Sequence, residues 1–361
     1  MKSKLLTVIV PSYNMENYLR ACLGSVLSDN PMADRLDVIV VNDGSKDGTS
    51  AIAHEIEAAH PGVIRVIDKE NGNYGSCVNA GIREACGRFV KILDADDTFD
   101  TIAFERYLRF LDELADGSDP DVVFNDFVEV DPDGKTVVRH SFPFLDGPGA
   151  ALSDFDYSEP DRKLWMHAVA YRLDLLRRIG YRQTEGVFYS DQEWAVVPMM
   201  DARSFRHSPE PVYRYLVGRA GQTVAGNVRL RHYGMHLRVE KRIVETLVEN
   251  RRNHPDAEFS FAERQIENHL ASFYSEFLLV HPKMLPEGEL REFDGFLHAV
   301  APDFHRYAGT LSTAFTPLRF RFRFVRHWRK AGKRNSLAFR LADFGLSVRR
   351  YRNRFAKHAS T

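Results

Sequence analysis

The stretch FVKILDADD, residues 89–97, is the most informative part of this chain for both its fold and its chemistry. Residues 89–93 form a short, β-rich apolar run that predicts a buried strand. Three carboxylates follow directly, at the end of the strand where open α/β sheets bind their ligands. Alternate residues at a strand end share a face, so Asp94 and Asp96 are predicted to converge while Asp97 points elsewhere. Such a pair suits Mg²⁺ or Mn²⁺ carrying a diphosphate, and the alternative is a solvated acidic turn that caps the next helix.

The residues before this stretch alternate between strand and helix patterns with short turns. The predicted strands cover residues 5–11, 36–41, 63–67 and 89–93, and the predicted helices between them cover residues 15–28, 47–59 and 74–85. Val- and Ile-rich strands without polar alternation are typical of strands buried on both faces. The pattern therefore predicts an α/β fold with a mainly parallel, Rossmann-like sheet and helices on both sides.

The pattern changes after residue 97. We expect helices at residues 101–114, 164–179 and 191–200, strands at 122–130 and 136–142 around the turn DPDG, an irregular strand at 204–215, and long helices through 229–279. The predicted organisation is a domain at residues 1–225 with two halves, residues 1–100 and residues 101–225. A helical extension at 226–318 and a basic amphipathic tail at 319–361 follow.

The charge of this 361-residue chain is unevenly distributed. The net charge is -1, but residues 319–357 contain fourteen Lys and Arg and a single acid, which leaves 35 basic and 49 acidic residues elsewhere. The three cysteines lack metal-binding spacing and indicate reduced thiols. The apolar run at residues 5–10 is short and lacks a cleavage site, and no run reaches the roughly 18–20 residues of a membrane-spanning helix. We therefore expect a cytoplasmic protein, at most attached to the membrane surface.

Two further strand ends carry candidate ligand-binding residues. Residues 8–14, VIVPSYN, stand where a dinucleotide-binding domain would have G-x-G-x-x-G, which argues against NAD or FAD. Pro11 and Tyr13 can present a flat wall to a nucleobase there, or form an ordinary turn with a buried tyrosine. In residues 41–49, VNDGSKDGT, Asp43 lies at a strand tip and can accept hydrogen bonds from a base imide or ribose hydroxyls.

The loop before the third helix has the composition of a ligand-binding loop. Its sequence, NGNYGSCVN at residues 71–79, has two glycines that allow backbone to approach a ligand, ahead of a helix N-terminus that attracts phosphate oxygens. Asn79 is a polar residue on an otherwise apolar helix face. The phosphate-loop signature G-x-x-x-x-G-K-[ST] is absent from this loop.

Together, in this order and spacing, these four segments resemble the family 2 glycosyltransferases, strongly over residues 5–100 and more loosely to about residue 225. The resemblance implies the A-type nucleotide-sugar fold and an inverting transfer, with Asp43 on the uracil or ribose. It implies that residues 1–225 are a glycosyltransferase domain, with a nucleotide-binding half at 1–100 and an acceptor-binding half at 101–225. It also implies that Asp94 and Asp96 hold Mn²⁺ or Mg²⁺ on the donor diphosphate. The implied donor site comprises Pro11, Tyr13, Asp43, Asn71, Gly72, Asn79, Asp94, Ala95 and Arg219.

The family's other signature is an acidic pair before a helix, whose second member is the catalytic base. Residues 188–194, FYSDQEW, match it with Asp191 as the base, but Ser190 stands where the family usually has Glu, which keeps Glu193 as an alternative. Arg219 lies in a stretch that resembles the family's mobile segment and can pair with the diphosphate. His167, beside a tryptophan, is either part of the acceptor pocket or a core residue.

The expected function is transfer of a sugar, from a nucleotide sugar that is probably UDP-linked, to a hydroxyl of a saccharide or lipid-linked acceptor in surface polysaccharide or glycolipid synthesis. The alternative is a non-catalytic nucleotide-sugar-binding scaffold subunit. A glycosidase would not need a nucleotide cradle, and a nucleotidyltransferase would need a basic glycine loop after the first strand. The tail at 319–357, with its alternating basic and aromatic residues, is expected to bind an anionic membrane surface, with nucleic acid or a partner protein as the rival interpretation.

Overall fold

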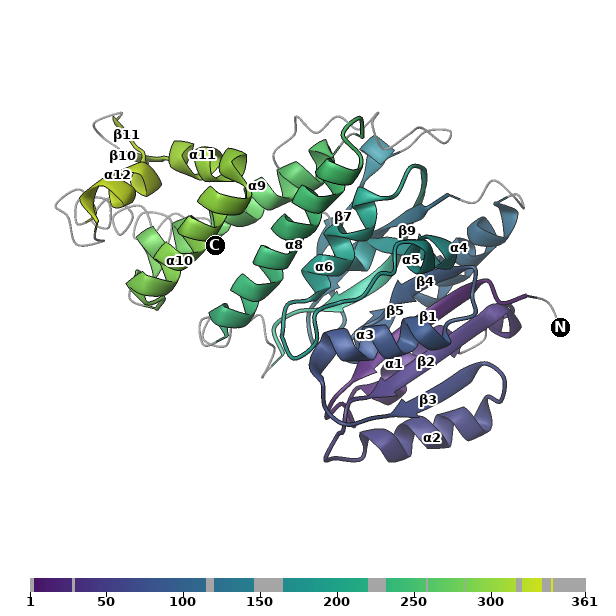
Figure 1. Ribbon diagram of the computed structural model, residues 1–361. Coiled ribbons are helices and arrows are strands. Elements are labelled where there is room, and N and C mark those ends of the chain that lie inside the picture. Colours follow the sequence, from purple (N-terminus) through teal and green to yellow (C-terminus); the bar gives the residue numbers. More distant parts are fainter. Residues whose placement is uncertain are drawn as a thin grey trace, which may run out of the picture. The chain divides into compact units, whose positions relative to one another are not determined.

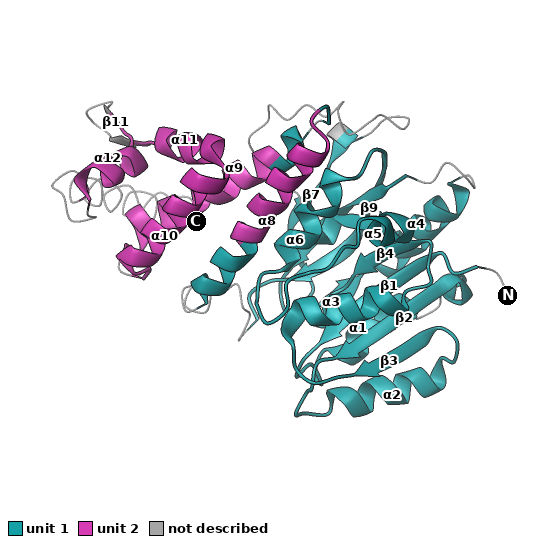
Figure 2. Cartoon of the chain, viewed as in Figure 1, with its two compact units in different colours: residues 1–239, 256–262 teal, residues 240–255, 263–361 magenta. Residues whose placement is uncertain are grey.

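The computed structural model describes residues 3–27, 30–114, 120–145, 165–219, 232–257, 259–282, 284–315, 320–332 and 339. The chain divides into two compact units, residues 1–239 with 256–262 and residues 240–255 with 263–361 (Figure 2). The predicted boundary at residue 225 and most of the tail lie outside the described residues. All of the candidate site residues belong to the first unit.

The first unit is built on a nine-stranded sheet in the order β3-β2-β1-β4-β8-β6-β9-β5, with β7 paired to β6 (Figure 1). Its strands are β1 (Leu6–Ser12), β2 (Leu36–Asn42), β3 (Ile64–Asp68), β4 (Phe89–Ile92), β5 (Thr98–Phe99), β6 (Val122–Val130), β7 (Thr136–His140), β8 (Val169–Arg172) and β9 (Phe205–Leu216). The pairs β1–β2, β1–β4, β2–β3 and β6–β9 are parallel. The predicted mainly parallel α/β fold is confirmed.

Helices cover both faces of this sheet, whose strands β1 and β2 are buried along their whole length. The helices are α1 (Leu19–Leu27), α2 (Thr49–Ala59), α3 (Asn73–Glu84), α4 (Thr101–Glu113), α5 (Leu173–Arg178) and α6 (Asp191–Val196), with short 3-10 turns η1 (Ala33–Arg35), η2 (Pro143–Leu145), η4 (Met166–Ala168) and η5 (Pro198–Met200). The chain runs outward from β1 to β3 and then returns to β4. Because such crossovers are right-handed, α1 and α2 lie on one face and α3 on the other. The strand order therefore reverses between β1 and β4, where ligands bind in sheets of this kind.

The prediction of a single helix at residues 164–179 is wrong. The structure has the turn η4, the strand β8 and the short helix α5 there, and β8 is inserted antiparallel between β4 and β6. Val169, Ala170 and Tyr171 are fully buried, as expected for a central strand, and a short apolar run cannot be told from a helix by its spacing. The predicted helices at 15–28 and 191–200 are also shortened, because α1 begins at Leu19 and α6 ends two residues before Pro198.

The second unit is helical. Its elements include α8 (Tyr233–Asn253) and α9 (Ser260–Ser275), which both begin in the first unit, and then the π-turn η6 (Glu276–Val280), α10 (Glu287–Val300), α11 (Pro302–Thr310), the antiparallel pair β10 (Thr313–Phe315) and β11 (Phe320–Phe322), and α12 (Phe324–Ala331). This agrees with the long helical pattern predicted at residues 229–279. Among the described residues, no helix has both the length and the apolar character needed to cross a membrane.

The described part of the basic tail contributes to the core of the second unit. Phe322, Phe324 and Trp328 are at most 5% exposed, and the Trp328 indole donates to Glu287 at 2.6 Å. Arg329 forms an ion pair with Asp294 at 2.6 Å. The expectation that the tail binds a membrane through its alternating basic and aromatic residues does not hold for these aromatic side chains, because packing in the unit already buries them.

Candidate active site

The candidate residues gather at one edge of the sheet because β1, β2 and β4 are parallel and end there. Ser12 pairs with Asn42 across β1 and β2, and Ile9 pairs with Ile92 across β1 and β4. The loops that follow these strands carry Tyr13, Asp43 and Asp94. The carboxyl edge of the sheet thus collects polar groups that are up to 81 residues apart in the chain.

Asp43 organises the loops on the β2 side of this edge. It is 3% exposed, and its Oδ1 accepts from Lys69 Nζ at 2.5 Å and from the Gly72 amide at 2.9 Å. The Asn71 side chain donates to the Asp43 carbonyl at 3.0 Å. A side chain at Gly72 would collide with Ser76, since a Cβ there would lie 2.6 Å from its Oγ. Asp43 therefore shapes the loop at 69–72, and its contact with a base or ribose stays a prediction.

Tyr13 is one of the few large apolar side chains exposed on the first unit. It is 46% exposed just beyond the end of β1, whereas Pro11 is buried within that strand. The next residue, Asn14, adopts a left-handed backbone with φ of 55°, and its side chain accepts from the Lys46 amide at 2.8 Å. An exposed ring on an anchored loop is suited to stacking against a planar ligand.

Asn79 has a structural role that its sequence position did not reveal. It is buried on α3, where its side-chain amide donates to the Gln183 carbonyl at 3.0 Å and to Glu185 at 2.9 Å. Its Oδ1 accepts from the Gln183 amide at 2.8 Å. These bonds join α3 to the segment that leads to Asp191, and they account for a polar residue on an apolar face. The predicted contact between Asn79 and the donor stays a prediction.

The three carboxylates after β4 are not arranged as an extended strand would place them. The strand ends at Ile92, and the Asp97 amide donates to the Asp94 carbonyl at 3.0 Å, which makes residues 94–97 a turn with Ala95 buried inside it. Alternation along a strand does not apply to a turn. The expectation that Asp97 points elsewhere is therefore wrong, because ligand atoms of Asp94, Asp97 and His167 lie within 4.8 Å of one another.

The carboxyl group of Asp94 is strongly perturbed by its surroundings. Burial raises the pKa of Asp94 to about 7, and the nearby charges of Asp96 and Asp191 act in the same direction. The Tyr74 hydroxyl donates to Asp94 Oδ1 at 2.7 Å and opposes this shift. A carboxyl group crowded by other acids is stabilised in its charged form by a divalent cation, so the residues fit such an ion.

Asp96 and Asp97 have different partners. Asp96 forms an ion pair with Arg219, with 2.6 Å between Oδ2 and Nε, and the guanidinium of Arg219 also lies 5.0 Å from the ring centre of Tyr18. Asp97 is buried and accepts from the Tyr213 hydroxyl and the Leu216 amide, both at 2.7 Å. Burial and the charges of Asp96 and Asp94 raise the pKa of Asp97 well above its usual range.

His167, which the sequence left as either an acceptor-pocket or a core residue, adjoins these carboxylates. Its ring stacks on Tyr215 at 4.5 Å between centres and meets Tyr213 edge-on at 4.6 Å. Burial, with the charge of Lys91, lowers the pKa of His167 to about 3, so the imidazole is neutral at physiological pH. Within the described chain its Nδ1 is buried without a hydrogen-bond partner. A neutral imidazole with an unpaired nitrogen beside two carboxylates fits a divalent cation.

Asp191 and Glu193, the two candidate bases, have clearly different surroundings. Asp191 begins α6, is half-buried, and is close enough to raise the pKa of both Tyr74 and Asp94. Glu193 is fully buried, and its two oxygens accept from the Thr184 amide at 2.8 Å and the Thr184 hydroxyl at 2.6 Å. Glu193 thus anchors the preceding loop, which favours Asp191 as the group that meets a substrate.

The backbone before Asp191 is strained. Tyr189 has a φ of 68°, a left-handed conformation that a residue with a bulky side chain seldom adopts. Ser190 is buried, and its hydroxyl donates to Gln183 at 3.3 Å. A small residue at position 190 therefore fits a closed space, where the longer glutamate usual in the resembled family would need more room.

Comparison with known proteins agrees with this geometry. Residues 7–167 match the family model described as glycosyl transferase family 2. The chain carries a glycosyl transferase family 2 domain. The glycosyltransferase EpsJ of Bacillus subtilis is 28% identical over 216 residues, which are 58% of this chain and 60% of EpsJ.

A second sequence relative and a solved structure also match this chain. The minor teichoic acid biosynthesis protein GgaB of B. subtilis is 36% identical over 107 residues, 30% of this chain and 12% of GgaB. The match thus spans less than two thirds of either relative's length. The crystal structure of S. aureus TarS 1-349 in complex with UDP-GlcNAc has a TM-score of 0.69 at 18% identity, covering 95% of this chain and 92% of that one. The fold, an α/β sheet followed by C-terminal helices, is therefore shared with TarS.

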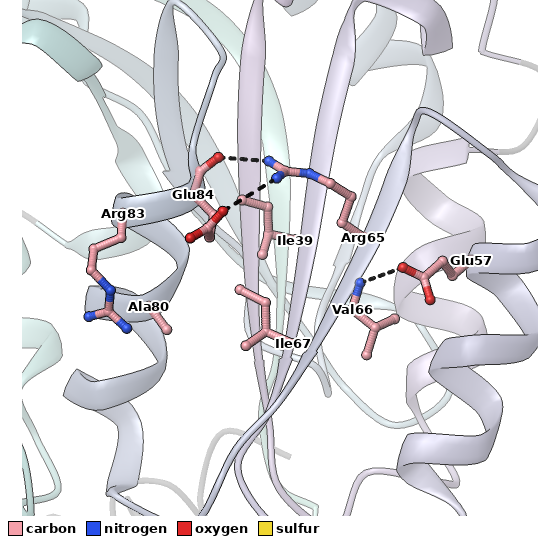
Figure 3. Close-up of a pocket in the computed structure, with 8 residues that line it drawn as sticks. All are labelled: Ile39, Glu57, Arg65, Val66, Ile67, Ala80, Arg83 and Glu84. Carbon is pink, nitrogen blue, oxygen red and sulfur yellow. Dashed lines mark hydrogen bonds and ion pairs between the residues drawn. The ribbon is translucent and has the colours of Figure 1, made fainter.

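A separate pocket of about 380 Å³ lies between α2, β3 and α3 (Figure 3). Two arginines and two glutamates line it, and Arg65 donates to the Glu84 carbonyl at 2.8 Å. Arg65 also pairs with Asp37 at 2.7 Å. The charges of this pocket largely compensate one another, and the acidic residues of the candidate active site are not among those that line it.

Proposed function

We propose that this protein is an inverting, metal-dependent glycosyltransferase that moves a sugar from a UDP-linked donor to a hydroxyl of a saccharide or lipid-linked acceptor. The observation that carries the proposal is the cluster of Asp94, Asp97 and His167 near Asp191, at the carboxyl edge of a family 2 domain. The UDP-GlcNAc bound by TarS supports a UDP-linked donor. The role of GgaB in teichoic acid biosynthesis supports a surface polymer or glycolipid as the product.

The donor nucleotide is proposed to lie across the ends of β1 and β2. Tyr13 offers an exposed ring for the base, and Asp43, at the end of β2, would accept from the base or ribose. Asn71 and Gly72 form the loop between this point and the N-terminus of α3, which favours phosphate oxygens. Asn79 and Ala95 are buried, so we propose that they form the inner wall of the donor site.

The diphosphate is proposed to lie over the turn at residues 94–97. Asp94 and Asp96 would hold a Mn²⁺ or Mg²⁺ ion, which when bound offsets the charge that develops on the departing phosphate oxygens. Asp96 and Arg219 form an ion pair and offset each other's charge. A diphosphate offers Arg219 oxygen acceptors in place of Asp96, so donor binding would release Asp96 for the cation.

Asp191 is proposed to take the proton of the acceptor hydroxyl as that oxygen attacks the anomeric carbon. The nucleoside diphosphate leaves from the opposite face, so the configuration of the sugar inverts. General base catalysis of this kind contributes about 10²–10⁴-fold to a rate. Glu193 does not take part in this step, because its oxygens are bonded to Thr184.

The test compares Asp96→Asn and Asp191→Asn with the wild type, using calorimetric titration of UDP-, GDP- and dTDP-sugars with and without Mn²⁺. We expect one nucleotide class to bind to the wild type with Mn²⁺, and we expect Asp96→Asn to lose this metal dependence. Asp191→Asn should bind the donor normally but transfer its sugar at least about 10²-fold more slowly. A full transfer rate in Asp191→Asn would refute the base assignment. A wild type that binds a donor but transfers its sugar to no acceptor or water would support the alternative, a non-catalytic scaffold subunit.

The basic tail is proposed to place the enzyme on the anionic inner face of the cell membrane. In the described part, Arg321, Arg323, Arg326 and Lys330 are exposed, whereas the aromatic residues between them are buried. Attraction of this kind is mainly electrostatic and weakens with salt. Sedimentation with vesicles that contain or lack anionic lipid tests it, and binding to a nucleic acid duplex in preference to these vesicles would overturn it.

A further inference from the structure

His167 owes its position to the antiparallel pairing of β8 with β4. Phe89 pairs with Arg172 and Val90 with Tyr171, so the chain leaves β4 at the same edge where it enters β8. Asp94 follows the last residue of β4 by two positions, and His167 precedes the first residue of β8 by two, so both lie at this edge. The turn η4, which precedes β8, therefore brings His167 close to the acidic turn at 94–97, which follows β4.

The main chain at His167 accepts hydrogen bonds from two buried polar side chains, Lys91 and Asn125. Lys91 Nζ donates to the His167 carbonyl at 2.9 Å, to Asn125 Oδ1 at 2.7 Å and to the Val169 carbonyl at 3.4 Å. Asn125 in turn donates to the His167 carbonyl at 3.3 Å. Lys91 and Asn125 are both 0% exposed, and burying such groups in the centre of a sheet is unfavourable unless they are hydrogen-bonded, as they are here.

The ring of His167 is restrained as well. It is 5% exposed and packs against Tyr213 and Tyr215, which leaves the imidazole little freedom to turn away from the carboxylates. Its buried Nδ1 lacks a hydrogen-bond partner within the described chain, although buried polar atoms are nearly always paired. The His167 ring is therefore restrained, has a nitrogen without a hydrogen-bond partner, and has a ligand atom within 4.8 Å of those of Asp94 and Asp97. These are the properties of a metal ligand.

We infer that His167 supplies a nitrogen ligand to the cation at Asp94, and that Lys91 and Asn125 position it through its main chain. This inference rests on the proposed function, because that function supplies the cation. Imidazole nitrogen binds Mn²⁺ and later transition metals better than Mg²⁺, which prefers oxygen alone. The site is therefore tuned for Mn²⁺ over Mg²⁺, a selectivity that two carboxylates alone would provide less strongly.

Electron spin-echo envelope modulation of Mn²⁺ bound with UDP tests this directly, without any measurement of transfer. We expect ¹⁴N modulation in the wild type, its replacement by ¹⁵N modulation when only histidine is ¹⁵N-labelled, and its loss in His167→Gln. Mn²⁺ affinity should fall about tenfold or more in that variant, whereas Mg²⁺ affinity should change much less. His167→Asn is the second variant, should the first fail to fold.

His140→Gln is the matched control, because His140 belongs to the same aromatic cluster, 5.7 Å from Trp165, and is not part of the group near Asp94. It should keep the ¹⁴N modulation. Bound Mn²⁺ without histidine modulation, or modulation that survives in both His167 variants, would overturn the inference and leave the proposed function intact. A wild type that binds no Mn²⁺ with any nucleotide would overturn the metal dependence itself, and this inference with it.

Discussion

Replacing the buried lysine at the centre of the sheet should change the stability of the protein in a way that depends on pH. Lys91 is 0% exposed, and within the described chain its ammonium bonds only to neutral oxygens, those of Asn125, His167 and Val169. Burial lowers the pKa of Lys91 from 10.5 to about 7. Lys91→Met has a similar shape and carries no charge, so it removes this titration from the folded state.

The magnitude follows from the difference between the two pKa values. Between pH 7 and 10.5 the folded protein releases the Lys91 proton while the unfolded chain retains it, so the free energy of unfolding rises with pH in this window. Each pKa unit is worth about 1.4 kcal/mol, so burying the charged lysine costs on the order of 5 kcal/mol below pH 7. The stability of Lys91→Met relative to the wild type should therefore fall by about 2–3 kcal/mol from about pH 6 to about pH 9.

The hydrogen bonds that Lys91→Met loses add an offset that does not depend on pH. Each acceptor left unpaired costs about 1–3 kcal/mol, so the variant can be more or less stable than the wild type at any single pH. The pH dependence of the difference is the quantity that tests the reasoning.

The assay is equilibrium urea unfolding at a series of pH values, followed by tryptophan fluorescence, in which Trp165 and Trp194 report on the first unit. Lys135→Met is the control, because Lys135 is exposed in the turn between β6 and β7. Its difference from the wild type should stay constant with pH. A constant difference for Lys91→Met as well, within about 0.5 kcal/mol, would refute the argument that a buried charge is being titrated.

Two further predictions concern the support of Asp191. Gly75→Ala places a Cβ 2.2 Å from the Thr184 carbonyl oxygen, so it should destabilise the protein by about 1–3 kcal/mol and slow transfer, as measured by thermal unfolding and initial rates. Gly288→Ala, a helical position with open space around it, is its control and should raise stability by about 0.5–1 kcal/mol. Glu193→Gln should lower stability by about 1–3 kcal/mol through its bonds to Thr184 while the folded protein keeps its transfer rate to within a few-fold. A loss of rate as large as that of Asp191→Asn would instead identify Glu193 as the base.

Apart from the two-residue strand β5, which depends on its pairing with β9, the order of strands and helices in residues 5–114 could be predicted from the sequence because its signals are local. Runs of Val and Ile, the turns that follow them and the Asp100 cap of α4 depend on a few neighbouring residues each. Parallel strands that end at one edge then bring Asp43 and Asp94 to the same side without any knowledge of packing. Most of the candidate donor site follows from this rule.

The roles of individual side chains depended on contacts between distant segments. The strand β8 has an apolar pattern that suits a helix equally well, and its pairing with β4 and β6 decided the outcome. That pairing brought His167 to the acidic turn, which no short-range pattern could indicate. The same reason separates Asp191 from Glu193, since Glu193 is bonded to a loop that packs against α3.

The sequence by itself thus determined the fold class, the family resemblance and the edge of the sheet where the chemistry lies, because local propensity and strand direction specify these. Only the tertiary structure decided that residues 94–97 form a turn, that Asn79 joins α3 to the loop before Asp191, and that His167 faces Asp94. The last two depend on bonds or packing between residues far apart in the chain, and the turn, although closed by a local bond, is also held by Tyr213 and Leu216, which donate to Asp97. A one-dimensional pattern does not name such partners.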